Sequence, residues 1–207
     1  MGNIIIIGSG GHAKHLKSII TDFNNSFVFD GFLESKNNLK TKYNDKNVKN
    51  KIKNKNVHFV NGLGNFAYYW YPNVFKNYTN KKLKFIKLIH KTSIISKISK
   101  IGYGTTIMEN ALIKSNSKIG KFCLVNSQST ISHNVTVGNY CNISLGARIG
   151  GNCSIGNNTF IGMNAVIRQG LKIGSNSIIG AGSVVIKNIP NNVVAAGNPT
   201  IMIKKNL

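Results

Sequence analysis

The chain has 207 residues, of which 42% are hydrophobic, and its formal net charge is +22 at pH 7. This length allows one or two domains with a core, and no apolar run approaches the ~20 residues of a membrane-spanning helix. Nearly all basic residues are lysines spread along the chain, whereas nucleic-acid-binding proteins cluster basic residues and favour arginine. We therefore expect no nucleic-acid partner, although a positive field suits small polyanions such as nucleotide phosphates.

The first part of the chain, residues 1–88, is predicted to alternate strands and a helix. Strands are expected at 3–7, 27–33, 57–61 and 83–89, a helix from the glycine-rich turn to about residue 22, a partly helical stretch at 64–77, and a solvated loop at 36–55. This order implies a small α/β domain with a parallel sheet, half of a Rossmann-like fold. The start of the chain is typical of a buried strand and not of a secretion signal, so we expect a cytoplasmic protein.

A glycine-rich turn joins the first strand to the first helix. Gly8, Gly10 and Ala13 follow the pattern Gly-x-Gly-x-x-Ala, which brings backbone N–H groups close to a phosphate at a helix start. A full dinucleotide fold needs two mononucleotide halves, and residues 1–88 supply only one. The turn therefore favours the mononucleotide part of a substrate over NAD or FAD, with Asp30 at about the distance expected of a ribose-binding acid.

From residue 89 to residue 185, every sixth residue is Ile or Val. This spacing is typical of a hexapeptide repeat, in which short strands and turns stack into a β-helix. From Ile95 on, a compact side chain that also points inward lies two residues before each Ile or Val; Cys123, Cys141 and Cys153 fall there, which predicts structural thiols. Three residues after it, Asn or Gly dominates, which predicts a corner with left-handed backbone. We expect the β-helix at 89–188 and a C-terminal cap and tail at 189–207.

His133 is the one histidine of the repeat region after its first coil, and it lies in neither inward column. An imidazole that titrates near neutrality is a natural general base for moving an acyl group from a thioester to an amine or hydroxyl. A surface histidine without a function fits the same position. A single histidine argues against the three-histidine zinc site of a γ-type carbonic anhydrase, and no other cluster has ligand spacing, so we predict no metal. No exposed Cys or activated Ser is evident, which favours direct transfer in a ternary complex.

The chain as a whole resembles the hexapeptide-repeat sugar O- and N-acetyltransferases, typified by sialic-acid O-acetyltransferase and bacillosamine N-acetyltransferase. The matching segments are 8–13, 31–34, 62–65, 89–90, 125–127, 132–134, 180–185 and 197–199. The resemblance implies a left-handed parallel β-helix and a homotrimer with active sites between subunits. It also implies acetyl-CoA as the donor and the amine of a UDP- or dTDP-linked amino-deoxy sugar as the acceptor.

The resemblance further implies roles for individual residues. His133 matches the catalytic base, and Asn134 stands beside it. The residues that match the nucleotide-sugar site are Gly8, Gly10, Gly11, His12, Glu34, Gly62 and Asn126. Those that match the acetyl-CoA site are Asn142, Gly151, Gly180 and Ala181, with the backbone N–H of Gly151 facing the acetyl oxygen.

Three positions depart from the family pattern. The acid that usually follows the base is Asn134, the residue before the base is Ser132 where Glu is common, and Asn142 replaces a second histidine. Asn can hydrogen-bond to an imidazole but cannot stabilise imidazolium by charge, which favours an amine acceptor over a hydroxyl. Asn134 also lies in the corner column, where a structural role fits equally well. Two alternatives stay open: O-acetylation of a free acidic sugar such as sialic acid, and a catalytically inactive homologue that binds a sugar nucleotide.

Overall fold

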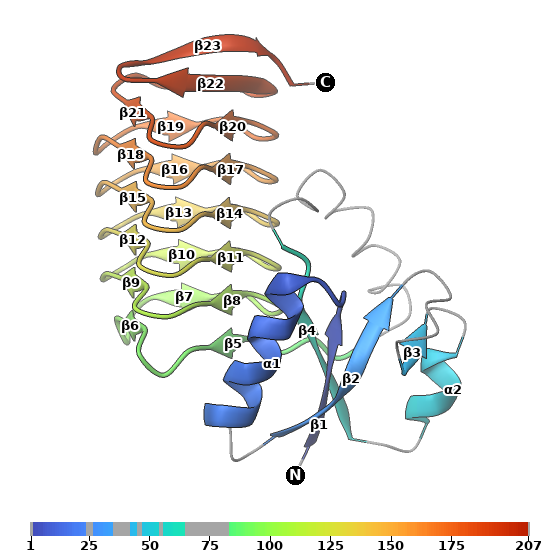
Figure 1. Ribbon diagram of the computed structural model, residues 1–207. Coiled ribbons are helices and arrows are strands. Elements are labelled where there is room, and N and C mark those ends of the chain that lie inside the picture. The colour runs from blue at the N-terminus through green and yellow to red at the C-terminus, as the bar shows by residue number, and fades with distance from the viewer. Residues whose placement is uncertain are drawn as a thin grey trace. The chain divides into compact units, whose positions relative to one another are not determined.

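The computed structural model describes residues 2–23, 27–34, 42–44, 47–53, 56–64 and 83–206. The chain divides into two compact units, Met1–Ile86 and Lys87–Leu207, which we call the front unit and the prism (Figure 1). Apart from its first residue, the partly helical stretch expected at 64–77 lies outside the described residues.

The front unit is built on a four-stranded parallel sheet. Its elements are β1 (Gly2–Ile7), α1 (Gly11–Phe23), β2 (Phe27–Glu34), β3 (Tyr43–Asn44), α2 (Val48–Ile52) and β4 (Val57–Asn61). The strand order is β3-β2-β1-β4, so β1 is central and its run of four isoleucines is buried, as expected for a strand covered on both faces. The buried side chains of α1 recur at helical spacing, namely Ala13, Leu16, Ile19 and Ile20, and face the sheet.

Two sequence-based expectations for the front unit are wrong. The stretch 36–55, expected as a solvated loop, contains β3 and α2 in its described part, and Tyr43 and Val48 are fully buried there. Because Lys and Asn are abundant around Tyr43 and Val48, the sequence showed no clear pattern for β3 and α2. The strand expected at 83–89 is instead a single bridge from Phe85 to Phe59, followed by the first short strand of the prism.

The prism is a stack of coils made of two-residue strands (Figure 1). These strands are β5 (Leu88–Ile89), β6 (Ile94–Ile95), β7 (Lys100–Ile101), β8 (Thr106–Ile107), β9 (Leu112–Ile113), β10 (Lys118–Ile119), β11 (Leu124–Val125), β12 (Thr130–Ile131), β13 (Thr136–Val137), β14 (Asn142–Ile143), β15 (Arg148–Ile149), β16 (Ser154–Ile155), β17 (Phe160–Ile161), β18 (Val166–Ile167), β19 (Lys172–Ile173), β20 (Ile178–Ile179) and β21 (Val184–Val185). Every third strand pairs in parallel, so the stack has three faces. This arrangement confirms the β-helix expected from the repeat.

One coil takes 18 residues, because Leu124 pairs with Asn142 and Val125 with Ile143 across adjacent coils. The last coil is followed by an antiparallel hairpin of β22 (Val193–Gly197) and β23 (Thr200–Lys205), which extends the face that contains β20. This hairpin lies in the stretch expected as a cap and tail.

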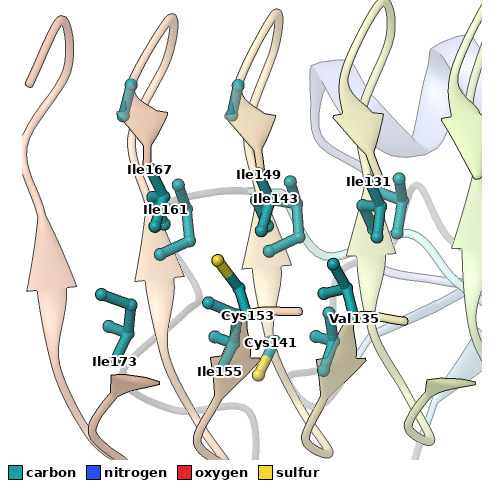
Figure 2. Packing of buried hydrophobic residues seen from close by; sticks show 14 of the residues in the cluster. Ile131, Val135, Cys141, Ile143, Ile149, Cys153, Ile155, Ile161, Ile167 and Ile173 are labelled. Carbon is teal, nitrogen blue, oxygen red and sulfur yellow. The ribbon is translucent and has the colours of Figure 1, made fainter. Parts of the chain in front are cut away.

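The interior of the prism is filled by the two inward columns (Figure 2). Ile131, Ile149 and Ile167 stack in one such row, and the three cysteines lie in the compact column, buried and unpaired by disulfides. Burial raises the pKa of the Cys141 thiol well above its usual range and also raises the pKa of the Cys153 thiol. Such thiols are poor nucleophiles, in agreement with the structural role expected for them.

The corner column has left-handed backbone from Gly104 to Gly182. Three positions in it are neither Asn nor Gly, yet Phe122, Gln128 and Tyr140 adopt φ of 53°, 60° and 58°. The repeat therefore imposes this conformation on residues that rarely adopt it. Asn188, also expected as a corner, is an exception, because the chain takes its left-handed turn at Asn192 instead.

Truncating one member of the inward row tests the core. We expect Ile143→Ala to lower the free energy of unfolding by about 2–5 kcal/mol, because Ile143 is 0% exposed and the cavity cannot fill. The matched control is Ile94→Ala on the outside of β6, where the side chain is 67% exposed and the loss should stay near ~0.5 kcal/mol. Chemical denaturation followed by circular dichroism measures both; equal losses would contradict this account of the core.

Candidate functional site

His133 stands at the turn from β12 to β13, within residues 132–135, which we call the His133 corner. Its carbonyl accepts a hydrogen bond from the Asn152 N–H at 3.0 Å, which ties the backbone to the next coil. The side chain is exposed and takes no part in the core. The imidazole is therefore held on a rigid element with its ring outside the prism.

Gly151 occupies the same corner one coil further along the chain. A Cβ added there would lie 2.6 Å from Cε1 and 2.7 Å from Nε2 of His133, so the ring lies directly against the Gly151 backbone. The Gly151 carbonyl accepts a hydrogen bond from the Gly170 N–H at 2.9 Å. Within the described part of the prism, the Gly151 N–H donates none of the backbone hydrogen bonds between coils. An imidazole and a buried backbone N–H that makes no hydrogen bond to another coil thus share one corner.

Asn134 contacts the His133 ring from the neighbouring position. Its Nδ2 lies 3.1 Å from Nδ1 of His133 and donates to Oδ1 of Asn152 at 3.2 Å. With the amide nitrogen toward Nδ1, the ring carries its proton on Nε2. A half-turn of the amide presents Oδ1 to an Nδ1–H and leaves a lone pair on Nε2, which is the form that a base needs. With φ of 57°, Asn134 makes the corner and contacts the imidazole at once.

A second polar group lies at the turn from β11 to β12, within residues 126–129, which we call the Asn126 corner. Asn126 is 8% exposed, and its Oδ1 accepts from the Ser127 N–H at 2.8 Å. The Ser127 hydroxyl donates to Oε2 of Glu109, one coil below, at 2.6 Å. Glu109 was not expected as a site residue from the sequence. Its rarity could have revealed it, since it is the only acidic residue in 87–207.

The residues that match the acetyl-CoA site do not form one cluster within the chain. Gly151 shares the His133 corner, whereas Asn142 lies fully buried on β14. Gly180 and Ala181 follow β20 on the Asn126 side of the prism, and the Gly180 N–H donates to the Ala195 carbonyl at 2.8 Å. The strand β12 separates the Asn126 corner from the His133 corner in one chain.

In the front unit, the predicted nucleotide residues converge at the carboxyl ends of β1, β2 and β4. Gly8 follows β1 with φ of 90°, and a Cβ there would approach a Leu63 methyl to 3.1 Å. Gly62 follows β4; a Cβ there would lie 2.3 Å from Cγ2 of Ile6, so only glycine fits. Glu34 ends β2 and accepts a hydrogen bond from the Ser9 hydroxyl. One edge of the sheet thus carries all of these positions.

The start of α1 completes this edge. Gly10 and Gly11 are exposed, with no heavy atom within 4 Å of an added Cβ, so their backbone is accessible. His12 lies in the first turn and is half-buried. Exposed N–H groups at a helix start suit a phosphate.

Asp30, expected as a ribose-binding acid, makes contacts to the neighbouring strand of the sheet. It lies within β2, accepts a hydrogen bond from the Tyr43 hydroxyl at 2.6 Å and forms an ion pair with Lys42. The hydrogen bond to Asp30 raises the pKa of Lys42, whereas burial is the main cause of the raised pKa of Tyr43. Asp30 therefore joins β2 to β3, and Glu34 is the acid at the edge.

The described residues include no group of three His, Cys, Asp or Glu side chains placed to hold a metal ion. In the same part of the chain, none of the helices has both the length and the apolar character needed to cross a membrane.

Comparison with known proteins gives two family matches. Residues 3–68 match the PglD N-terminal domain, and residues 152–187 match the bacterial transferase hexapeptide repeats. No curated protein matches the chain in sequence.

Solved structures match over nearly the whole length. The acetyltransferase domain of PglB from Neisseria gonorrhoeae is 27% identical, with 97% of this chain and 99% of that chain covered and a TM-score of 0.85. Perosamine N-acetyltransferase from Caulobacter crescentus, solved with CoA and GDP-perosamine, is 21% identical, with 99% and 98% covered and a TM-score of 0.89. WeeI from Acinetobacter baumannii is 23% identical, with 98% and 100% covered and a TM-score of 0.84.

These matches confirm the resemblance noted from the sequence and the fold class, a small α/β domain followed by a left-handed β-helix of hexapeptide repeats. They also confirm the class of enzyme, an acetyltransferase. The two structures below 25% identity contribute the fold alone.

Proposed function

We propose that this protein transfers the acetyl group of acetyl-CoA to the amine of a nucleotide-linked amino-deoxy sugar, with His133 as the general base. The observation that carries this proposal is the His133 corner, where an imidazole lies against the Gly151 backbone beside an N–H that serves no other coil. The PglB acetyltransferase domain from Neisseria gonorrhoeae, similar over nearly its whole length, has also been solved with acetyl coenzyme A. The Caulobacter crescentus enzyme, whose fold the chain shares, acts as a perosamine N-acetyltransferase.

The chemistry follows from the two groups of this corner. The amine nitrogen attacks the thioester carbonyl, a C–N bond forms, and Nε2 of His133 accepts the proton of the amine. The oxygen of the tetrahedral intermediate carries the negative charge, and the Gly151 N–H donates a hydrogen bond to it. The C–S bond then breaks, and the leaving thiolate takes the proton from the imidazolium. Asn134 orients the ring with its amide oxygen toward the Nδ1–H during this cycle.

The front unit would hold the nucleotide of the acceptor. The N–H groups of Gly10 and Gly11 at the start of α1 suit the phosphates, and Glu34 at the end of β2 suits the hydroxyl groups of the nucleoside. The net charge of +22 favours the approach of such an anion. UDP and dTDP are the nucleotides that the sequence resemblance implies, and the GDP-perosamine of the Caulobacter crescentus structure adds GDP.

The enzyme would work as a homotrimer with active sites between subunits. Asn126 matches a residue near the sugar and His133 matches the base, yet β12 separates their corners in one chain. A neighbouring copy can bring one corner to the other. Closed cyclic symmetry is the usual way for identical chains to assemble.

A thiol-release assay tests this function. With acetyl-CoA present, we expect CoA to be released with an amino sugar linked to UDP, dTDP or GDP, and not with the same nucleotide sugar that carries a hydroxyl in place of the amine. Acetylation of free sialic acid would instead support the O-acetyltransferase alternative. Tight binding of nucleotide sugars in calorimetry without any thiol release would support an inactive homologue.

A further inference from the structure

We infer that Asn152 is a positioning residue that selects the tautomer of the His133 imidazole through Asn134, an inference that rests on the proposed role of His133 as the base. Asn152 is bonded twice to the His133 corner. Its N–H donates to the His133 carbonyl at 3.0 Å, and its Oδ1 accepts from Nδ2 of Asn134 at 3.2 Å. The same Nδ2 lies 3.1 Å from Nδ1 of His133. One end of the Asn134 amide therefore faces both the imidazole and Asn152.

Only two arrangements of these three side chains keep both contacts as hydrogen bonds. In the first, the Asn134 amide nitrogen donates to Nδ1 of His133 and to Oδ1 of Asn152, so the ring proton is on Nε2. In the second, the Asn134 oxygen accepts from the Nδ1–H of His133 and from the Asn152 amide nitrogen, so Nε2 carries the lone pair. The proposed base needs the second arrangement. The Asn152 amide must therefore turn whenever the Asn134 amide turns.

Gly170 allows the Asn152 amide to turn without a loss in the next coil. At another corner of the prism, Asn176 accepts from Asn158 at 3.0 Å and donates to Asn192 at 3.0 Å, which fixes its amide from both sides. At the His133 corner, the next coil has Gly170 at the equivalent position, where an added Cβ would have no heavy atom within 4 Å. Turning Asn152 therefore breaks no bond to a corner side chain of the next coil, whereas turning Asn176 alone would break two.

The balance between the two arrangements is sensitive to position 152. Both contain the same number of hydrogen bonds between neutral groups, so their free energies are close, and a small preference imposed at Asn152 shifts the tautomer of His133. A carboxylate at position 134 would only accept and would hold the Nδ1–H tautomer by itself. Because position 134 is an amide in this chain, the choice of tautomer passes to Asn152.

The first test makes position 152 an acceptor only. In Asn152→Asp, the carboxylate holds Nδ2 of Asn134 toward itself and therefore the ring proton on Nε2. We expect kcat for thiol release to fall by about 10-fold, as for one charge-assisted hydrogen bond, with KM changed little. The loss should persist well above the pH range in which imidazole titrates, where protonation of the ring in response to the new charge no longer contributes.

The second test extends the row of amides without adding a charge. Gly170 has φ of 77° and Asn152 has φ of 58°, both in the left-handed region, so Asn can take position 170. In Gly170→Asn, the new amide oxygen would accept from the Asn152 nitrogen, as Asn192 accepts from Asn176, and would hold Oδ1 of Asn152 toward Asn134. We expect kcat to fall by about 3- to 10-fold, the effect of one neutral hydrogen bond, while Tm is kept or raised.

Nitrogen NMR of the His133 ring reports the tautomer directly and needs no substrate. We expect the Nδ1–H form to be populated in wild type and depleted in both variants. The control is Asn176→Asp, the same change in the amide row of another corner, which should leave the rate and the ring spectrum as in wild type. An unchanged ring spectrum in Asn152→Asp would overturn the inference, whatever the rate. Failure of the proposed function is a different result: wild type would release no thiol, while the tautomer would still respond to position 152.

Discussion

Replacing His133 with Ala is expected to lower kcat by about 10²- to 10⁴-fold, the range typical for loss of a general base. The imidazole is exposed and outside the core, so the fold should survive the change. Affinity for the nucleotide sugar in calorimetry should stay close to that of wild type, since the nucleotide is proposed to bind the front unit. Initial rates of thiol release measure the loss.

A matched substitution checks that the effect is specific to this histidine. His15→Ala changes an exposed histidine on α1, away from the residues assigned to either site, and should leave the rate within about two-fold of wild type. Unchanged turnover in His133→Ala would rule out His133 as the base and favour a substrate amine that attacks without assistance.

Gly151→Ala is expected to lower kcat by about 10²-fold although His133 itself is kept. The new Cβ would lie 2.6 Å from Cε1 of His133, a distance that real Cβ atoms do not show, so the ring must move. A displacement of about 1 Å at a reacting group costs on the order of 10²-fold in rate. The backbone N–H is retained in this variant, and the backbone of Gly151 lies outside the left-handed region, so Ala fits it.

A double-mutant cycle separates ring displacement from other effects. If Gly151→Ala acts only by moving the imidazole, then combining it with His133→Ala should cause no further loss of rate. A further loss of about 10-fold or more in the double variant would show that Gly151 contributes in another way, through its own N–H or through donor binding. Thermal unfolding of both variants checks that the prism stays folded.

Local sequence was sufficient for most of the architecture. A side chain that recurs every six residues must face the same interior in every coil, so the inward columns, the cysteines and most corners could be assigned in advance. The front sheet could also be predicted, from the apolar run of β1 and the glycine turn after it. The exceptions are elements held by few anchors: β3 and α2 depend on Tyr43 and Val48 within a Lys- and Asn-rich stretch, where composition outweighs pattern.

For the candidate site too, some features could be predicted from the sequence and others required the tertiary structure. The position of His133 outside both inward columns follows from counting residues, because the repeat assigns each position a direction. The contacts of the imidazole cannot be obtained by counting, because residues 18 apart meet only through the stacking of coils. In the structure, the His133 ring lies against Gly151, and Asn134 contacts the ring while its amide also donates a hydrogen bond to Asn152. For the same reason the Glu109–Ser127 pair could not be read from a pattern.

The sequence by itself determined that this protein has a small α/β unit with a parallel sheet, followed in the chain by a hexapeptide-repeat prism, because periodicity and glycine turns are local properties of the chain. Only the tertiary structure decided that Asp30 joins β2 to β3 while Glu34 stands at the sheet edge, and that the one acidic side chain of the prism is bonded to Ser127. These contacts join segments that are distant in the chain, so they form only when the tertiary structure packs those segments together.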